Sequence, residues 1–197
     1  MNKWNWTIGL TCSFVIALTS GRAEARDIRI KGDWAGTGLT ARIDLNNDGG
    51  LADWATWVEK SNLGQSSAQS VIEAVLVPPT GACPAGQLET GVVAGGSAVN
   101  TFLHTRDQLF NQVTSRLLCI DLVTGAFSAH SIATITGGTG KFAGATGSIE
   151  YRFTGLTFLA DPASNQSFGS FTGTIEGTLI LPNGGHDKGG HGKDKED

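Results

Sequence analysis

The sequence predicts an all-β protein of one domain, closed into a barrel rather than packed as a sandwich. The 197 residues are enough for one sizeable domain, and only 16% of them are charged. Short runs rich in Thr, Ile, Phe and Val recur with turn signals between them, at the spacing of about 8–12 residues that is typical of sandwiches and barrels. The 28 glycines also fall inside these runs, where glycine often marks a bend at a barrel corner.

The first 25 residues have the pattern of a secretory signal peptide. Lys3 supplies a positive charge, an apolar stretch follows over 8–18, and Ala23 and Ala25 are the small residues that flank a cleavage site. The apolar stretch is well below the ~20 residues that a membrane-spanning helix needs, so a removed signal is favoured over an anchor. We therefore predict cleavage after Ala25, a secreted or periplasmic location, and a barrel domain over 26–182.

Predicted strands follow one another along this domain. The first half contains runs at 34–44, 54–60, 70–77, 87–95 and 98–105. A Ser/Gln-rich turn is expected after residue 60, and Pro78 ends the third run because proline cannot donate to a strand ladder. The second half contains runs at 113–123, 127–136, 148–159 and 168–181. Together they give eight or nine strands.

Alternation of apolar and polar residues is clearest in the last two runs. The apolar faces carry Ile149, Tyr151 and Phe153 in one run, and Phe171, Ile175 and Leu179 in the other. Gly173 and Gly177 lie on the same apolar face of the last run. Glycines in that position favour a closed barrel over a sandwich.

The segment ITGGTGKFAGATG, residues 135–147, is rich in glycine, but its spacing excludes a phosphate-binding loop. A dinucleotide fingerprint needs glycine where Ala143 stands, and a P-loop needs Ser or Thr where Phe142 follows the lysine. The run that follows alternates like a strand and not like a helix. The segment therefore predicts a turn between two strands, with left-handed backbone at some of its glycines. Its structural glycines are Gly137, Gly138, Gly140, Gly144 and Gly147.

This segment resembles the glycine turn of the allene oxide cyclase/dirigent barrel superfamily, in its bacterial secreted members. In that family a GGTG-x-F stretch followed by Ala-x-Gly lies between two late strands, and the flanking runs CIDLVTGAFSAHSIATI and FGSFTGTIEGTLIL are similar too. The matching positions are Gly137, Gly138, Thr139, Gly140, Phe142, Ala145 and Gly147. The resemblance, over 113–181, implies an eight-stranded antiparallel barrel, often oligomeric, with a mainly apolar cavity. Plant relatives cyclise an unstable fatty-acid epoxide or steer the coupling of phenolic radicals; the matched motif is a turn, so it transfers fold and not chemistry.

Two cysteines, Cys83 and Cys119, remain after removal of the signal peptide. An even number of cysteines in an oxidising compartment predicts a disulfide, and two buried thiols are the alternative. The bond would stabilise the fold by roughly 3–4 kcal/mol in the chain-entropy view.

The stretch DLNNDGGLADWA, residues 44–55, follows the first part of a calcium-loop pattern. Asp44, Asn46 and Asp48 occupy the first three ligand positions, but Ala55 stands where the bidentate glutamate is expected. The two interpretations are a Ca²⁺ site of extracellular type and an Asn/Asp/Gly hairpin loop that holds no ion. Beyond this ion we expect no cofactor.

Acid/base candidates come from polar positions on neighbouring predicted strands: His130, Glu150, Arg152 and Glu176. Glu150 and Arg152 are two residues apart and therefore point to the same side of their strand. They would suit a catalytic pair inside the barrel, and equally an exposed cross-strand ion pair.

Candidate ligand contacts come from large aromatic residues of the first half: Trp34, Trp54, Trp57 and Phe102. They suit the lining of a ligand cavity, and equally the packing of a core and a barrel end.

Residues 183–197 change character, with two histidines among Gly, Lys and Asp and no apolar side chain, and they predict a disordered tail. The net charge of −4 and the absence of a basic stripe exclude a nucleic-acid-binding protein.

The sequence is compatible with three functions. The leading hypothesis is a secreted barrel that binds a small apolar ligand and steers its cyclisation or coupling, with homo-oligomerisation as a further expectation. The alternatives are a structural or adhesive module with a filled interior, stabilised by calcium, and an isomerase with its own acid/base residues. A cavity of roughly 300 Å³ or more would favour binding, and a filled core would favour the module.

Overall fold

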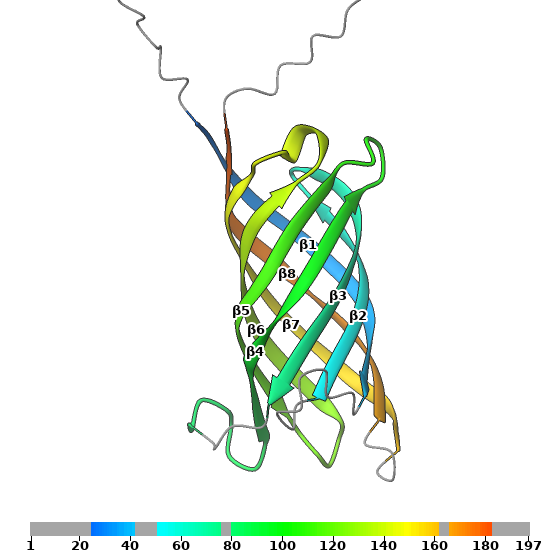
Figure 1. The fold of residues 1–197 in the computed structure, drawn as a ribbon. Coiled ribbons are helices and arrows are strands. Elements are labelled where there is room, and N and C mark those ends of the chain that lie inside the picture. Colours follow the sequence, from blue (N-terminus) through cyan, green and yellow to red (C-terminus); the bar gives the residue numbers. More distant parts are fainter. Residues whose placement is uncertain (1–24, 42–50, 76–79, 162–165, 183–197) are drawn as a thin grey trace, which may run out of the picture.

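The protein is a closed barrel of eight antiparallel strands, each hydrogen-bonded to the next in sequence and β8 to β1 (Figure 1). The computed structural model describes residues 25–41, 51–75, 80–161 and 166–182. The predicted fold class is confirmed. The strands are β1 (Arg26–Ala41), β2 (Leu51–Ser61), β3 (Gly64–Val75), β4 (Leu88–Phe102), β5 (Gln108–Ile120), β6 (Ala126–Gly138), β7 (Thr146–Asp161) and β8 (Gln166–Leu181), with a 3₁₀ turn, η1 (Gly140–Phe142), between β6 and β7.

Two strands differ from the sequence prediction. β3 begins at Gly64, so the Ser/Gln-rich stretch predicted as a turn is strand. Its small residues Ser66, Ala68 and Ser70 are buried and alternate with exposed neighbours, and the turn itself is the two residues Asn62 and Leu63. The predicted runs 87–95 and 98–105 are one strand, β4, because the glycines between them form an irregularity in its pairing rather than a break.

The interior of the barrel is filled from alternate positions of each strand. In β1 the inward residues include Ile30 and Trp34, and in β8 they include Phe171, Ile175 and Leu179. The intervening positions of both strands carry mostly Thr, Lys, Asp and Glu and are exposed. In these two strands the period of two places the apolar face inside and the polar face outside.

Glycines on the inward face make room for the large rings. Gly173 is the register partner of Trp34, and Gly36 is the partner of Trp57. A Cβ on Gly173 would lie 2.2 Å from the carbonyl oxygen of Arg152 and 2.6 Å from the Cβ of Phe153. The strands therefore approach one another at these points more closely than a residue with a side chain allows.

The glycine-rich segment 135–147 lies at one end of the barrel, at the top of Figure 1, and Phe142 within it is buried. Its predicted left-handed backbone is confirmed, with positive φ at Gly137, Gly140, Gly144 and Gly147. η1 directs Phe142 into the barrel, where its ring lies 4.7 Å from that of Phe102. Phe142 and Phe102 belong to a buried apolar core that also includes Ile30, Leu109, Ile135, Ile149, Ile175 and Leu179.

A β-bulge in β5 reverses the side-chain alternation halfway along the strand. The register with β6 shifts between Val113 and Ser115. Val113 points inward before the shift, and Arg116 and Leu118 point inward after it. Bulges of this kind re-aim side chains, and here the result is an arginine in the interior.

Several predictions concern residues that the structure does not describe. These are the signal peptide over 1–25 apart from its last residue, the calcium-loop residues Asp44, Asn46 and Asp48, and the tail over 183–197. No helix within the described ranges has the length and apolar character needed to cross a membrane.

Substitution Gly173→Ala tests the packing of strands against rings. We expect it to lower the free energy of unfolding by about 1–3 kcal/mol, the usual cost of overpacking, because the new methyl group meets backbone atoms that cannot move aside. Urea denaturation with the disulfide intact measures the change. Gly38→Ala is the matched control on the same inward face, since its Cβ would come no closer than 3.4 Å to any atom. Equal destabilisation by both substitutions would contradict this account.

Candidate functional site

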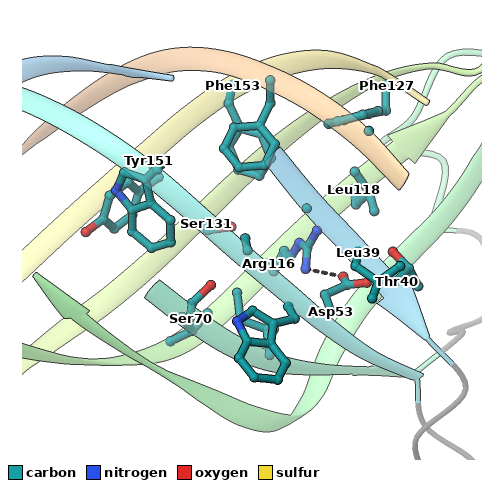
Figure 2. Close-up of a pocket in the computed structure, with 18 of the residues that line it drawn as sticks. Leu39, Thr40, Asp53, Ser70, Arg116, Leu118, Phe127, Ser131, Tyr151 and Phe153 are labelled. Carbon is teal, nitrogen blue, oxygen red and sulfur yellow. Dashed lines mark hydrogen bonds and ion pairs between the residues drawn. The ribbon is translucent and has the colours of Figure 1, made fainter. Parts of the chain in front are cut away.

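A cavity of about 120 Å³ occupies the lumen at the end of the barrel opposite η1. Toward this end it reaches Leu39, Thr40 and Asp53, near the end of β1 and the start of β2, and we call this part of the described lining its mouth. The lining is mainly apolar and aromatic, and Figure 2 shows Phe127 and Phe153 on its wall and Tyr151 farther from the mouth. Most of the remaining polar lining residues are small, such as Ser70 and Ser131.

Trp34 is the centre of an aromatic layer that forms the floor of this cavity. Its ring centroid lies 4.9 Å from those of Phe153 and Phe171, 5.4 Å from that of Trp57 and 5.6 Å from that of Tyr151. Most of these contacts are edge-to-face, the geometry that aromatic quadrupoles favour, and each is worth about 0.5–1.5 kcal/mol beyond its buried area. The layer fixes the shape of the floor.

The cavity volume limits what can enter. It is smaller than the roughly 300 Å³ expected of a typical ligand pocket. It is close to the roughly 150 Å³ of an apolar cavity that takes up benzene. The lumen is therefore neither filled nor large, and its size suits a single ring or one end of a longer molecule that extends through the mouth.

An ion pair lies across the lumen near the mouth. Nη1 of Arg116 is 2.5 Å from Oδ2 of Asp53, and the two side chains are 10% and 13% exposed, respectively (Figure 2). Asp53 comes from β2 and Arg116 from β5, and two strands separate them around the wall. Sequence reasoning did not find this pair, because the bulge in β5 had no visible signal in the pattern of residues.

A buried polar layer lies on the far side of the aromatic floor. The side-chain amide of Asn100 donates to Oε2 of Glu59 at 2.9 Å, and that of Asn111 donates to Oδ1 of Asn100 at 2.8 Å. Ser66, the register partner of Glu59, is also buried. Three strands, β2, β4 and β5, thus contribute one hydrogen-bonded chain across the interior.

Glu59 is the titratable centre of this layer. Burial raises the pKa of its carboxyl from 4.5 to about 7, although the hydrogen bond from Asn100 favours the charged form. Burial also raises the pKa of the Tyr151 phenol, and the negative charge of Glu59 raises it further. Tyr151 therefore stays a neutral donor, while Glu59 changes its protonation state near neutral pH.

Several polar atoms around Glu59 lack a hydrogen-bond partner among the described residues. They include the hydroxyl groups of Ser66 and Tyr151 and the side-chain oxygen of Asn111. Buried polar groups are nearly always satisfied, so this concentration marks a place where water or a polar ligand atom belongs. The signal for Glu59 was present in the sequence, because it is two residues after Trp57 and so shares its face.

The four predicted acid/base residues lie on the outer wall and not in the lumen. Nε2 of His130 is 2.9 Å from Oε1 of Glu150, and Arg152 forms an ion pair with the same carboxylate oxygen. Glu176 is the register partner of Glu150 and is exposed. The predicted proximity is therefore present, but these side chains face away from the cavity and form the exposed cross-strand arrangement that was the alternative.

The predicted aromatic residues divide between the two ends of the barrel. Trp34 and Trp57 are buried in the cavity floor, and Trp54 lies at its edge with 56% of its surface exposed. Phe102 is not part of the cavity, because it packs under Phe142 at the η1 end.

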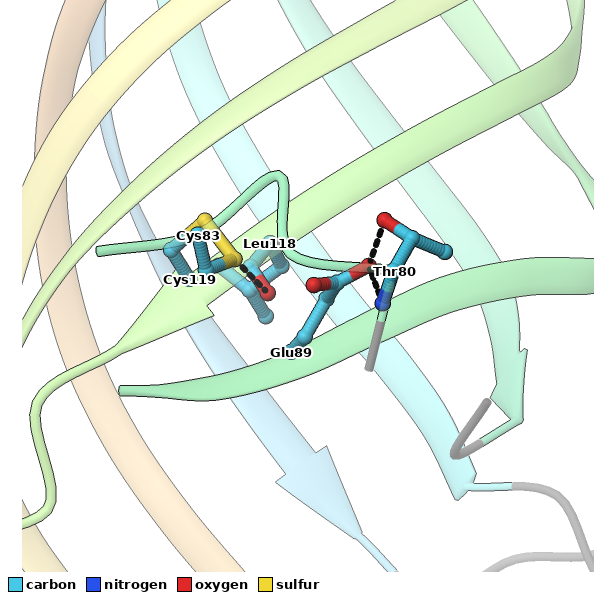
Figure 3. Close-up of a disulfide and its surroundings, with 5 residues drawn as sticks. All are labelled: Thr80, Cys83, Glu89, Leu118 and Cys119. Atoms are coloured by element: carbon cyan, nitrogen blue, oxygen red, sulfur yellow. Dashed lines mark hydrogen bonds between the residues drawn. A yellow bond between two sulfur atoms is a disulfide. The ribbon is translucent and has the colours of Figure 1, made fainter. Parts of the chain in front are cut away.

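The predicted disulfide is confirmed, with Cys83 joined to Cys119 at an S–S distance of 2.01 Å (Figure 3). It fastens the loop before β4 to the outside of β5. Beside it, the Thr80 hydroxyl donates to Glu89 at 2.6 Å, and this hydrogen bond lowers the pKa of the Glu89 carboxyl. The loop is thus held at two points of the outer wall, away from the lumen.

Among the residues with described positions, no three His, Cys, Asp or Glu side chains gather in a way that could hold a metal ion. Comparison with protein-family models, with curated proteins and with solved structures finds no match to the chain. The fold and the site define a closed β-barrel with an aromatic cavity at one end and a buried carboxyl beneath it. The resemblance of the glycine turn to the allene oxide cyclase/dirigent superfamily stays a prediction.

The raised pKa of Glu59 predicts that stability falls as the pH rises. Between pH 4.5 and about 7 the unfolded chain has lost the Glu59 proton and the folded chain has kept it, so the free energy of unfolding decreases across this window. The interval corresponds to about 3 kcal/mol. We expect the free energy of unfolding of Glu59→Gln, relative to that of the wild type, to increase by this amount between pH 4.5 and 7.5, measured by urea denaturation. A difference between the two proteins that does not change with pH would contradict the assignment.

Proposed function

We propose that this protein is a secreted ligand-binding barrel that takes a small apolar molecule, or the apolar end of one, into the lumen and holds it in one orientation. The observation that carries the proposal is the open aromatic cavity around Trp34 at the end opposite η1. Concave apolar sites with a few convergent polar groups are the usual form of small-molecule sites. The barrel would steer a cyclisation or coupling by holding the ligand in the conformation that reacts.

The filled-barrel alternative accounts for only one half of the interior. The η1 end is packed around Phe142 and Leu109 and needs no ligand. The other half leaves a cavity whose apolar walls a purely structural protein would have reason to fill, because empty apolar volume is destabilising. This difference between the two ends supports the binding proposal.

Substitution Ser131→Leu tests the proposal by filling the cavity. Ser131 lies in the lining of β6, opposite Arg116 in the register, and a larger side chain would occupy the volume that a ring needs. We expect toluene to bind the wild type with measurable heat in a calorimetric titration and the variant at least about tenfold more weakly. Ser128→Leu, on the same strand but exposed, is the control and should bind like the wild type. Absence of toluene binding to the wild type would refute the proposal.

A second candidate function is an isomerase, and Glu59 favours it. A carboxyl with a pKa of about 7 exchanges protons readily near neutral pH. Glu59 does not line the cavity, but the neighbouring Tyr151 does, so a proton would pass between the ligand and Glu59 through the Tyr151 hydroxyl group. These two residues, and not the outer-wall set, are the acid/base candidates of the described interior.

Proton exchange into a ring-sized ketone tests this second function. We expect the wild type in heavy water to accelerate deuterium incorporation next to the carbonyl of cyclohexanone, with a rate that rises through pH 7 as Glu59 ionises. Glu59→Gln should lose the acceleration, and Glu150→Gln on the outer wall should retain it. Mass spectrometry of the recovered ketone provides the rates, and equal rates for wild type and Glu59→Gln would exclude a role for this carboxyl as the base.

A further inference from the structure

Asp53 and Arg116 are the two charged residues among the described lining of the cavity. All other lining side chains are apolar, aromatic or small hydroxyl groups, apart from glycine. The pair therefore controls how the cavity treats a charged or polar ligand group. No second cation lines the described part of the cavity to compensate an incoming negative charge.

Arg116 has hydrogen-bonding capacity that Asp53 does not use. Its side chain is nine-tenths buried, and Nη1 donates to Asp53. Nε is buried and has no partner among the described residues, although a guanidinium carries five N–H donors. An unsatisfied buried donor is unfavourable, so an acceptor oxygen placed here by a ligand would gain a hydrogen bond to a charged group.

The charge of Arg116 is already compensated by Asp53. A ligand carboxylate would bring a second negative charge beside Asp53 into an apolar lumen, where like charges repel strongly and desolvation is costly. A neutral carbonyl or ether oxygen would accept the same hydrogen bond without either penalty. The two residues therefore favour ligands with a neutral acceptor oxygen over ligands with a carboxylate.

We propose that the Asp53–Arg116 pair selects neutral, ring-sized apolar molecules that carry an acceptor oxygen, and that Asp53 excludes the corresponding carboxylic acids as anions. The inference rests on the proposed binding function and names the class of ligand for the same cavity. Arg116 orients the ligand oxygen, and Asp53 sets the charge that the cavity accepts.

Three probes of similar size separate the contributions of the ring, the acceptor oxygen and the negative charge to binding. Toluene has a ring without an acceptor, benzaldehyde adds a neutral carbonyl, and benzoate adds a carboxylate. In calorimetric titrations of the wild type at pH 7.5, we expect benzaldehyde to bind about tenfold more tightly than toluene, as one hydrogen bond to a charged donor allows. Benzoate should bind at least about tenfold more weakly than benzaldehyde.

Substitution of Asp53 reverses the selection. In Asp53→Asn the charge of Arg116 has no counter-ion in the described lumen, so benzoate should bind more tightly than benzaldehyde. Asp33→Asn removes the same charge from the exposed face of β1 and should leave the wild-type order unchanged. The double variant Asp53→Asn/Arg116→Met has no buried charge in this cavity, and it should bind benzaldehyde and toluene within about threefold of each other.

The outcomes distinguish this inference from the proposed function. If toluene binds but benzaldehyde and benzoate bind equally well to the wild type, the selection is refuted and the binding function stands. If Asp53→Asn folds, as shown by its urea transition, and still rejects benzoate, Asp53 is not the filter. If no probe binds to the wild type, both proposals fail together.

Discussion

The close approach of strands at inward-facing glycines, beside the large aromatic rings, is the constraint on which the rest of the interior depends. Gly173, the register partner of Trp34, lets β8 approach Phe153 of β7 closely, and Gly36 lets β1 approach Trp57 of β2 closely. The resulting aromatic layer divides the lumen in two. On the side of Phe142 lie the packed apolar core and the polar layer around Glu59, and on the other side lies the cavity.

The same layer isolates a carboxyl from water. Glu59 follows Trp57 on the inner face of β2, and the rings of Trp57 and Tyr151 separate it from the cavity mouth. The hydrogen-bonded chain through Asn100 and Asn111 compensates only part of the desolvation, and this is why its pKa rises although every hydrogen bond to it acts in the opposite direction. A barrel interior that were purely structural would be more stable with apolar residues at these positions.

The sequence predicted the barrel because its signals are local and repeated. Alternation in β7 and β8, and glycines on the apolar face, indicate the strands and their closure without reference to tertiary contacts. The site was harder to predict for two physical reasons. Alternation shows which residues share a face but not which face is inner, so Glu150 and Arg152 were as plausible as Glu59. The bulge between Val113 and Ser115 also reverses the alternation, and a continuous period of two places Arg116 outside.

The inward position of Arg116 says most about the role of the interior, because it reduces the stability of the fold in two independent ways. The chain interrupts the ladder of β5 to turn this residue inward, and it supplies Asp53 from a non-adjacent strand to compensate the charge. A buried ion pair is rarely more stabilising than apolar residues of the same volume, so stability alone does not explain the arrangement. The pair borders the cavity and leaves one donor of Arg116 without a partner in the described structure. An oxygen atom of the ligand as the hydrogen-bond partner of this Arg116 donor would explain why the barrel keeps both unfavourable features.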